Sequence, residues 1–126
     1  MINFLKGTNI ALALAVAFVG NGQLVEFKSL LSSPRSFHHR NISLVGFAHA
    51  FGDAFAVYET EDAAAKRDVS RGVFVRQPAD GPDYDRFDNQ WIRISGVIDA
   101  NEHGNGWFPC GITVERVQQV KPPIRR

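Results

Sequence analysis

Two segments of the chain, fifty residues apart, repeat one pattern of hydrophobic and polar positions. Residues 37–46 read FHHRNISLVG and residues 87–96 read FDNQWIRISG: Phe, four mostly polar residues, two aliphatic residues in alternation, and a final Gly. Alternation with a period of two is typical of a strand with one buried face. The pattern therefore predicts two similar strands. A glycine inside a strand predicts a bulge or sharp bend, here at Gly46 and Gly96, and the strands continue beyond these glycines to Phe51 and Asp99.

Three further strands are expected from short hydrophobic runs. They cover residues 54–59, 72–77 and 110–120, and the first of them returns from a tight turn at Gly52-Asp53. Together with the two similar strands they give five strands in all. Because two of the five are long and bent, the sequence predicts a mainly β fold in which a small sheet closes into a barrel.

Short helices are expected in three of the connections. The first covers residues 29–37, before strand 1, and is interrupted near Pro34. The second follows strand 2, with Thr60 as its N-cap and two acidic residues in its first turn, where negative charge is favourable. The third covers residues 83–88, before strand 4. The tail, residues 121–126, contains two prolines and cannot extend a sheet.

The first 22 residues have the three-part layout of a secretory signal. Lys6 precedes a ten-residue apolar run, Ile10 to Val19, and the small residues of Gly20-Asn21-Gly22 follow. The run is too short for a stable membrane span, which needs roughly 20 apolar residues. We expect a periplasmic or secreted protein, or one tethered by an uncleaved N-terminal segment. An apolar first element of the core is the alternative interpretation.

The length and the net charge of the chain limit which classes of function are expected. The chain has 126 residues, 44% of them hydrophobic, which allows one domain, expected over residues 23–120. Without Lys6, 13 Lys and Arg balance 13 Asp and Glu in the remainder. Nucleic-acid binders gain much of their affinity by neutralising phosphates, so the neutral charge of this domain argues against nucleic acid as its partner.

The order of these elements resembles an OB-fold domain. In particular, it is similar to small exported bacterial proteins of unassigned function whose barrels are like the tRNA-anticodon-binding type, over residues 25–120. The resemblance implies ligand binding on the face of strands two and three. It places Phe55, Tyr58, Phe74 and Arg76 on that face. Trp91, opposite in parity to its aliphatic neighbours, is expected on the barrel exterior as a further binding residue.

The leading functional hypothesis is a binding or interaction module without enzymatic activity or cofactor. Its ligand is a small molecule, a glycan, a peptide or a partner protein, and its oligomeric state is not readable from the sequence. The sequence contains no nucleophile elbow and no phosphate-binding loop of the Walker type. A single-stranded nucleic-acid binder remains an alternative.

A second alternative is a small metal-assisted hydrolase. It would use four residues that could converge at one rim of the barrel, namely His38, His49, Asp53 and His103, with His49 and Asp53 as the candidate metal ligands. A half-buried histidine bonded to the backbone is the more common role. The single cysteine, Cys110, is expected to be buried, and it could form an intermolecular disulfide only if exposed.

Overall fold

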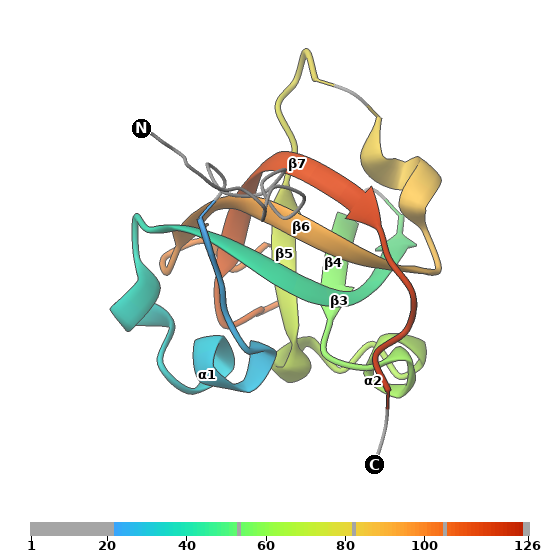
Figure 1. The fold of residues 1–126 in the computed structure, drawn as a ribbon, viewed down its shortest axis with the longest axis horizontal. Coiled ribbons are helices and arrows are strands. Elements are labelled where there is room, and N and C mark those ends of the chain that lie inside the picture. Colours follow the sequence, from blue (N-terminus) through green and yellow to red (C-terminus); the bar gives the residue numbers. More distant parts are fainter. Residues whose placement is uncertain (1–21, 53, 82, 105, 125–126) are drawn as a thin grey trace, which may run out of the picture.

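Five strands form a closed ring in the computed structural model, which describes residues 22–52, 54–81, 83–104 and 106–124. Around the ring, each strand pairs with the next in the order β3-β4-β5-β7-β6 and back to β3 (Figure 1). Their bounds are β3 (Asn41–Phe51), β4 (Ala54–Tyr58), β5 (Gly72–Arg76), β6 (Gln90–Asp99) and β7 (Gly111–Gln119). The predicted mainly β, five-stranded barrel is confirmed. A short strand, β2 (Gln23–Leu24), adds to β3 in parallel outside the ring.

Short helices occupy the three predicted connections. Before β3 lie α1 (Phe27–Ser32) and the 3₁₀ helix η2 (Pro34–Phe37); after β4 lie α2 (Glu61–Ala65) and η3 (Val69–Arg71); before β6 lies η4 (Tyr84–Phe87). The predicted cap is also present, since the Thr60 hydroxyl accepts the Ala63 N–H at 3.0 Å. No helix in the described part of the chain is long and apolar enough to cross a membrane. The predicted signal segment, except for Gly22, lies outside the described residues.

The two repeated segments pair with each other. Strands β3 and β6 run antiparallel, with Leu44 opposite Ile94, and these two residues occupy equivalent positions of the repeat. A local pseudo-two-fold axis therefore passes between them. At the neighbouring pair of the ladder, the buried Ser43 and Ser95 hydroxyls form a 2.7 Å hydrogen bond across the two strands.

The polar positions of the repeat anchor the ends of the paired strands. His38 Nδ1 accepts the backbone N–H of Ala100 at 2.9 Å, and Asp88 Oδ1 accepts the backbone N–H of Ala50 at 2.8 Å. His38 and Asp88 are equivalent in the repeat, and so are Ala50 and Ala100. The repeat thus specifies both the strands and the side chains that fix their ends.

Only one of the two repeat glycines forms a bulge. The pairing of β6 with β7 shifts register between Ser95 and Gly96, as predicted. The ladder between β3 and β6 runs unbroken through Gly46, so the predicted bulge there is wrong for that ladder. Gly46 is instead needed for close packing, because a Cβ at this position would overlap the Val57 side chain and lie 2.7 Å from the Tyr58 carbonyl oxygen.

Hydrophobic side chains form two clusters, one inside the barrel and one outside it. The interior cluster is built around fully buried residues, among them Leu30, Leu44, Phe55, Ile94 and Ile112. The second, which we call the outer cluster, covers the outer face of the sheet beside α2. It consists of Phe47, Ala56, Tyr58, Ala63, Ala64 and Phe108, with Val69, Phe74 and Trp91 partly buried against them.

Candidate functional site

A hollow lies on the outer face of the β3–β4 hairpin. His49 pairs with Ala56 and Phe51 with Ala54, so these four side chains share one face of the sheet. The two alanines are small, and they leave space above β4 that larger side chains would fill. The hollow therefore results from the alternation of small residues along one face of a strand.

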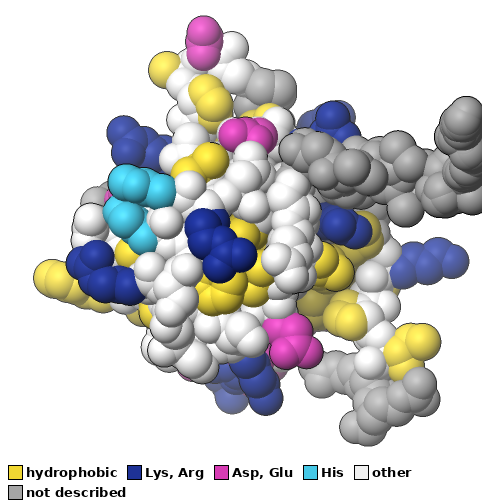
Figure 2. Space-filling view, turned by 60° about the vertical axis from the view of Figure 1, so that its left-hand side comes forward, with side chains coloured by type: hydrophobic (Ala, Val, Ile, Leu, Met, Phe, Trp, Pro, Cys, Tyr) yellow, Lys and Arg dark blue, Asp and Glu magenta, His cyan; other side chains and the backbone are white. Residues whose placement is uncertain are grey.

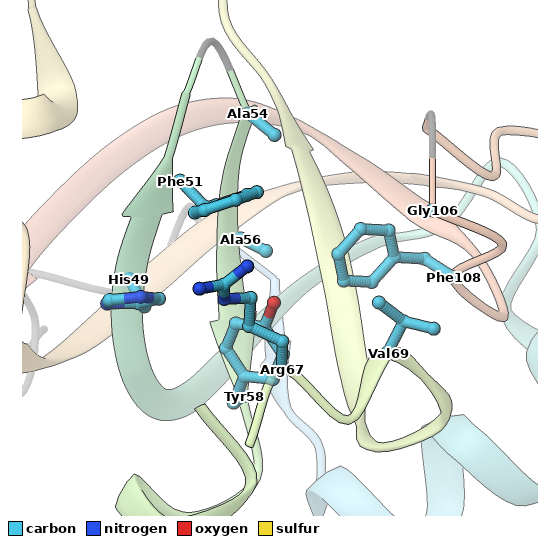
Figure 3. Close-up of a pocket in the computed structure, with 9 residues that line it drawn as sticks. All are labelled: His49, Phe51, Ala54, Ala56, Tyr58, Arg67, Val69, Gly106 and Phe108. Atoms are coloured by element: carbon cyan, nitrogen blue, oxygen red, sulfur yellow. The ribbon is translucent and has the colours of Figure 1, made fainter. Parts of the chain in front are cut away.

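This hollow is an apolar cavity of about 410 Å³, within the range of small-ligand sites. Figure 3 shows the hairpin side chains on one side of it and Val69 and Phe108 on the other. We call it the hairpin pocket. Its lining residues are His49, Phe51, Ala54, Ala56, Tyr58, Arg67, Val69, Gly106 and Phe108.

The connection between β6 and β7 forms one wall of the pocket, and Phe108 fixes it there. The Phe108 ring is 4% exposed, and its centroid lies 6.1 Å from the Tyr58 ring and 5.9 Å from the Phe74 ring. His103 Nδ1 lies 2.7 Å from the Phe108 carbonyl oxygen, to which it donates. Gly104, at φ +59°, lies so close to Phe74 that a Cβ would be 2.6 Å from the ring. The wall is thus tied to the sheet by packing, and the hydrogen bond between His103 and Phe108 holds the connection itself in shape.

Arg67 covers part of the pocket from the end of α2. Its guanidinium carbon lies 3.6 Å from the centroid of the Phe51 ring, a cation–π contact. Its backbone has φ +51°, a left-handed conformation that is uncommon for a residue other than glycine. The local chain path therefore directs this cation over the hairpin.

The Tyr58 hydroxyl is directed into the pocket beside Arg67 (Figure 3). Burial raises the pKa of this phenol, the positive charge of Arg67 lowers it, and the negative charge of Asp68 raises it again. The net direction is upward, so the hydroxyl stays protonated at neutral pH. The pocket thus contains a phenolic donor next to a guanidinium.

The residues predicted for a binding face lie in several places. Tyr58 lines the hairpin pocket, and Phe74 packs on Phe108 beside it. Arg76 lies on the same strand as Phe74, with a side chain 61% exposed that pairs with Glu102 at 3.6 Å. These three share the outer face of the barrel.

Phe55 and Trp91 lie elsewhere. Phe55 is 1% exposed inside the barrel, because it is three positions from Tyr58 and successive side chains of a strand alternate between faces. It therefore does not belong to the outer face with Tyr58. Trp91 is on the exterior, packed edge-to-face on Phe47 at 5.7 Å. It lines a different groove, together with residues 24–28 and Pro123.

The four residues of the hydrolase hypothesis are not seen to converge. His38 accepts a backbone N–H, and His103 donates to a backbone carbonyl. His49 Nδ1 lies 2.9 Å from Asn89 Oδ1 and 3.4 Å from Asp88 Oδ1. Asp53 lies outside the described residues, so the structure does not place the pair of His49 and Asp53. Among the described residues, no three His, Cys, Asp or Glu side chains are grouped as a metal site would require.

The histidines before β3 form a surface feature of their own. The rings of His38 and His39 stack with centroids 3.7 Å apart. Figure 2 shows histidine side chains gathered beside Lys and Arg side chains on one face of the molecule. Since His38 also accepts the Ala100 N–H, this pair helps to hold the strand end in place.

The Cys110 thiol is expected to be unreactive in the folded protein. The residue is fully buried, and burial together with the charge of Asp99 raises the pKa of its thiol to about 12. We expect no labelling by Ellman's reagent at pH 8 until denaturant unfolds the chain, when one thiol per chain reacts. Since the unfolded thiol ionises near pH 8.5, stability should also decline as the pH rises above that value toward 12. Rapid labelling of the native protein would contradict this assignment.

No protein-family model and no curated protein matches the sequence. Solved structures do match. A DUF3299 family protein from Pseudomonas aeruginosa matches with a TM-score of 0.50 and 11% identity, over 71% of this chain and 66% of that one. This chain therefore spans just under two thirds of that protein's length.

Two other matches have lower TM-scores. Replication protein A of U. maydis, solved bound to ssDNA, has 15% identity and a TM-score of 0.49 over 80% of this chain and 74% of that one. Asparaginyl-tRNA synthetase from Pyrococcus horikoshii has 14% identity and a TM-score of 0.42 over 68% of this chain and 21% of that one. Numbered along the ring, the five strands close in the order 1-2-3-5-4, a Greek-key barrel. The chain has an OB fold.

In OB-fold terms, β4 and β5 are strands two and three. The hairpin pocket lies on the outer face of β4, next to the turn that joins strands one and two and to the connection between strands four and five. These are the strands and loops that OB folds use for binding in general. The pocket therefore lies on one of the two strands that the sequence indicated, and ligand binding there stays a prediction.

Sequence reasoning did not find Phe51, Arg67 and Phe108 as lining residues. Phe51 is two positions after His49 in β3, so its side chain lies on the same face of the strand. Alternation along β3 could therefore have indicated Phe51 as a lining residue. The position of Arg67 depends on its left-handed backbone and on how the chain returns after α2, which no local pattern indicates. Phe108 reaches the pocket only because its connection folds back over the sheet.

Proposed function

We propose that this protein is an exported, non-enzymatic binding module that holds its ligand in the hairpin pocket. The observation that carries the proposal is the cavity itself, an apolar space of about 410 Å³ on the face that OB folds use for binding. Four of its lining residues, Ala56, Tyr58, Val69 and Phe108, are packed in or against the outer cluster, so this part of the pocket is formed before a ligand arrives. A small molecule, or one ring of a larger ligand such as a glycan or peptide, fits this space.

Other parts of the proposal rest on separate features. Export is supported by the layout of residues 1–22, with a basic residue, an apolar run and small residues. A non-enzymatic role is supported by how the candidate catalytic groups are used. His38 and His103 bond to the backbone, and the pKa of the buried Cys110 thiol is raised to about 12.

Filling the pocket tests the binding proposal. We expect Ala54→Phe to weaken the binding of indole, a neutral aromatic probe, at least tenfold, because the added ring occupies the cavity. The control is Ala65→Phe, which adds the same ring at an exposed position of α2 and should leave binding unchanged. Binding is measured by NMR titration of the full chain, following the amides of Ala56 and Gly106. Equal indole binding by wild type and Ala54→Phe, or no binding by either, would contradict the proposal.

Single-stranded nucleic acid is the second candidate. Two exposed aromatic rings favour it: Phe51 is 55% exposed at the pocket, and Trp107, between two lining residues, is 84% exposed. Such rings stack on bases in single-strand binders. The neutral charge of residues 23–126 argues against it. Titration with a 15-nucleotide oligo(dT) at 50 and 200 mM salt decides: steeply salt-dependent binding supports this candidate, and absent or salt-independent binding removes it.

A further inference from the structure

Arg67 differs from the cations around it because it makes no ion pair among the described residues. Its neighbours do: Lys66 pairs with Asp62 at 3.2 Å and Arg71 with Glu59 at 3.1 Å. Arg67 instead lies over Phe51, with its guanidinium carbon 3.6 Å from the ring centroid. A guanidinium left in this state beside an apolar cavity is available to an anionic group of a ligand.

Asp68 is the acidic group nearest in sequence to this cation, and it is already engaged. Its Oδ1 accepts the backbone N–H of Ser70 at 3.2 Å and the hydroxyl of Ser70 at 2.6 Å. This arrangement caps η3, so the carboxylate has a structural role at the start of that helix. The charge of Arg67 is thus not taken up by its sequence neighbour.

The Tyr58 hydroxyl supplies a second donor at the same end of the pocket. Figure 3 shows its oxygen beside Arg67 and directed into the cavity. Its ring is held by the outer cluster, with the side chain 4% exposed, so the hydroxyl has a fixed position. No side-chain hydrogen bond within the described residues uses this hydroxyl. A guanidinium and a phenolic O–H together form a compact donor set for one carboxylate.

Apart from His49, the side chains that line the rest of the pocket are apolar. Ala54 and Ala56 form its floor, and Val69 and Phe108 form the wall opposite the hairpin (Figure 3). These groups offer no hydrogen bonds, and their area favours a ligand body without polar atoms. The cavity of about 410 Å³ exceeds the volume of a bicyclic aromatic ring. The pocket thus combines an anion-binding end with an apolar chamber.

We propose that the natural ligand is a planar aromatic molecule carrying one carboxylate. The ring would lie against Ala54, Ala56 and Phe108, and the carboxylate would bind Arg67 and the Tyr58 hydroxyl. One cation without an ion pair among the described residues matches a single negative charge, whereas a phosphate monoester carries almost two at neutral pH. This inference rests on the proposed function and adds the chemistry of the ligand to it.

Two probes of similar shape distinguish the contribution of the ligand's charge to binding from the contribution of its shape. Indole-3-acetate carries the carboxylate, and indole-3-acetamide is its neutral counterpart. We expect the full chain to bind the acetate at least tenfold more tightly than the amide, measured by calorimetry at pH 7. Arg67→Gln should weaken binding of the acetate much more than binding of the amide, so that the preference is lost. Arg67→Lys should keep part of the preference, because it retains the charge without the planar fork.

Two further variants complete the design. Tyr58→Phe keeps the ring in the outer cluster and should weaken binding of the acetate several-fold, more than it weakens binding of the amide. Arg86→Gln is the matched control, because Arg86 also lies over an aromatic ring, Phe87 at 4.8 Å, but does not line the pocket. It should change neither affinity. Circular dichroism verifies that each variant is folded.

The outcomes separate this inference from the proposed function. If both probes bind equally, or Arg67→Gln keeps the preference, the carboxylate assignment is overturned, while a pocket blocked by Ala54→Phe still stands as the binding site. If indole binds but neither larger probe does, the ligand class is again wrong and the site is retained. If neither indole nor either probe binds, the site and the ligand class fail together.

Discussion

Replacing Gly96 by Ala is expected to destabilise the barrel by about 3 kcal/mol, near the upper end of the usual cost of overpacking. A Cβ at Gly96 would overlap the carbonyl oxygen of Thr113, and backbone atoms cannot move aside as a flexible side chain can. Thr113 also pairs with Arg76 in β5, so a shift of β7 at this point would disturb two ladders. Urea denaturation of the full chain, followed by tryptophan fluorescence, measures the change in the free energy of unfolding.

Gly52→Ala separates this overlap from the general cost of replacing a glycine. A Cβ at Gly52 would have no atom within 4 Å, but the backbone there has φ +60°. We expect a loss of about 1 kcal/mol, caused by the left-handed backbone alone. A Gly96→Ala variant as stable as Gly52→Ala would mean that the strands at the bulge can separate without cost, and would refute the tight packing inferred at Gly96.

The repeat of fifty residues carried most of the fold prediction, and it did so through alternation. Ile42 and Leu44, like Ile92 and Ile94, are fully buried inside the barrel, as a strand with one buried face requires. What alternation could not show was that the two strands pair with each other about Leu44 and Ile94. Strand pairing depends on contacts between distant residues, and the local pattern contains no information on the partner.

One polar residue of the repeat, His38, belonged to the alternative hydrolase hypothesis, and in the structure it makes a contact that supports the fold. His38 was a candidate for metal-assisted catalysis, yet its Nδ1 accepts a backbone N–H, as Asp88 does at the equivalent position. Because a histidine and an aspartate occupy equivalent positions and make equivalent contacts, the property they share at this position is a hydrogen-bond acceptor. The repeat therefore already contained evidence that this position has a structural role. That role can be recognised only when the pairing register of β3 and β6 is known.

The candidate pocket could be predicted as a region and not as a set of residues. The resemblance indicated strands two and three, and alternation places Ala54, Ala56 and Tyr58 on one face of β4 with Phe55 on the other. Strict use of that alternation would have excluded Phe55 from the predicted binding face, because Phe55 and Tyr58 point to opposite faces of β4. Arg67 and Phe108 arrive from connections whose paths depend on tertiary packing, so they become part of the pocket only in the folded chain.

Phe108→Ala is expected to destabilise the protein by about 3 to 4 kcal/mol, the usual range for removing a large buried aromatic ring. Phe108 is 4% exposed and contacts both Tyr58 and Phe74, so its loss opens a cavity between the outer cluster and the connection that covers it. Phe108 also forms a wall of the hairpin pocket, and indole binding should weaken in parallel. Thermal and urea denaturation measure the first effect, and NMR titration measures the second.

The neighbouring Trp107 supplies the matched control. It is a larger aromatic residue, adjacent in sequence, but it is 84% exposed. Trp107→Ala should change the free energy of unfolding by less than about 0.5 kcal/mol, as exposed substitutions usually do. Because an aromatic ring is removed in both variants, the difference between them isolates the burial of Phe108. If the two variants lose the same stability, Phe108 does not attach the connection to the sheet, and the pocket has no fixed wall on that side.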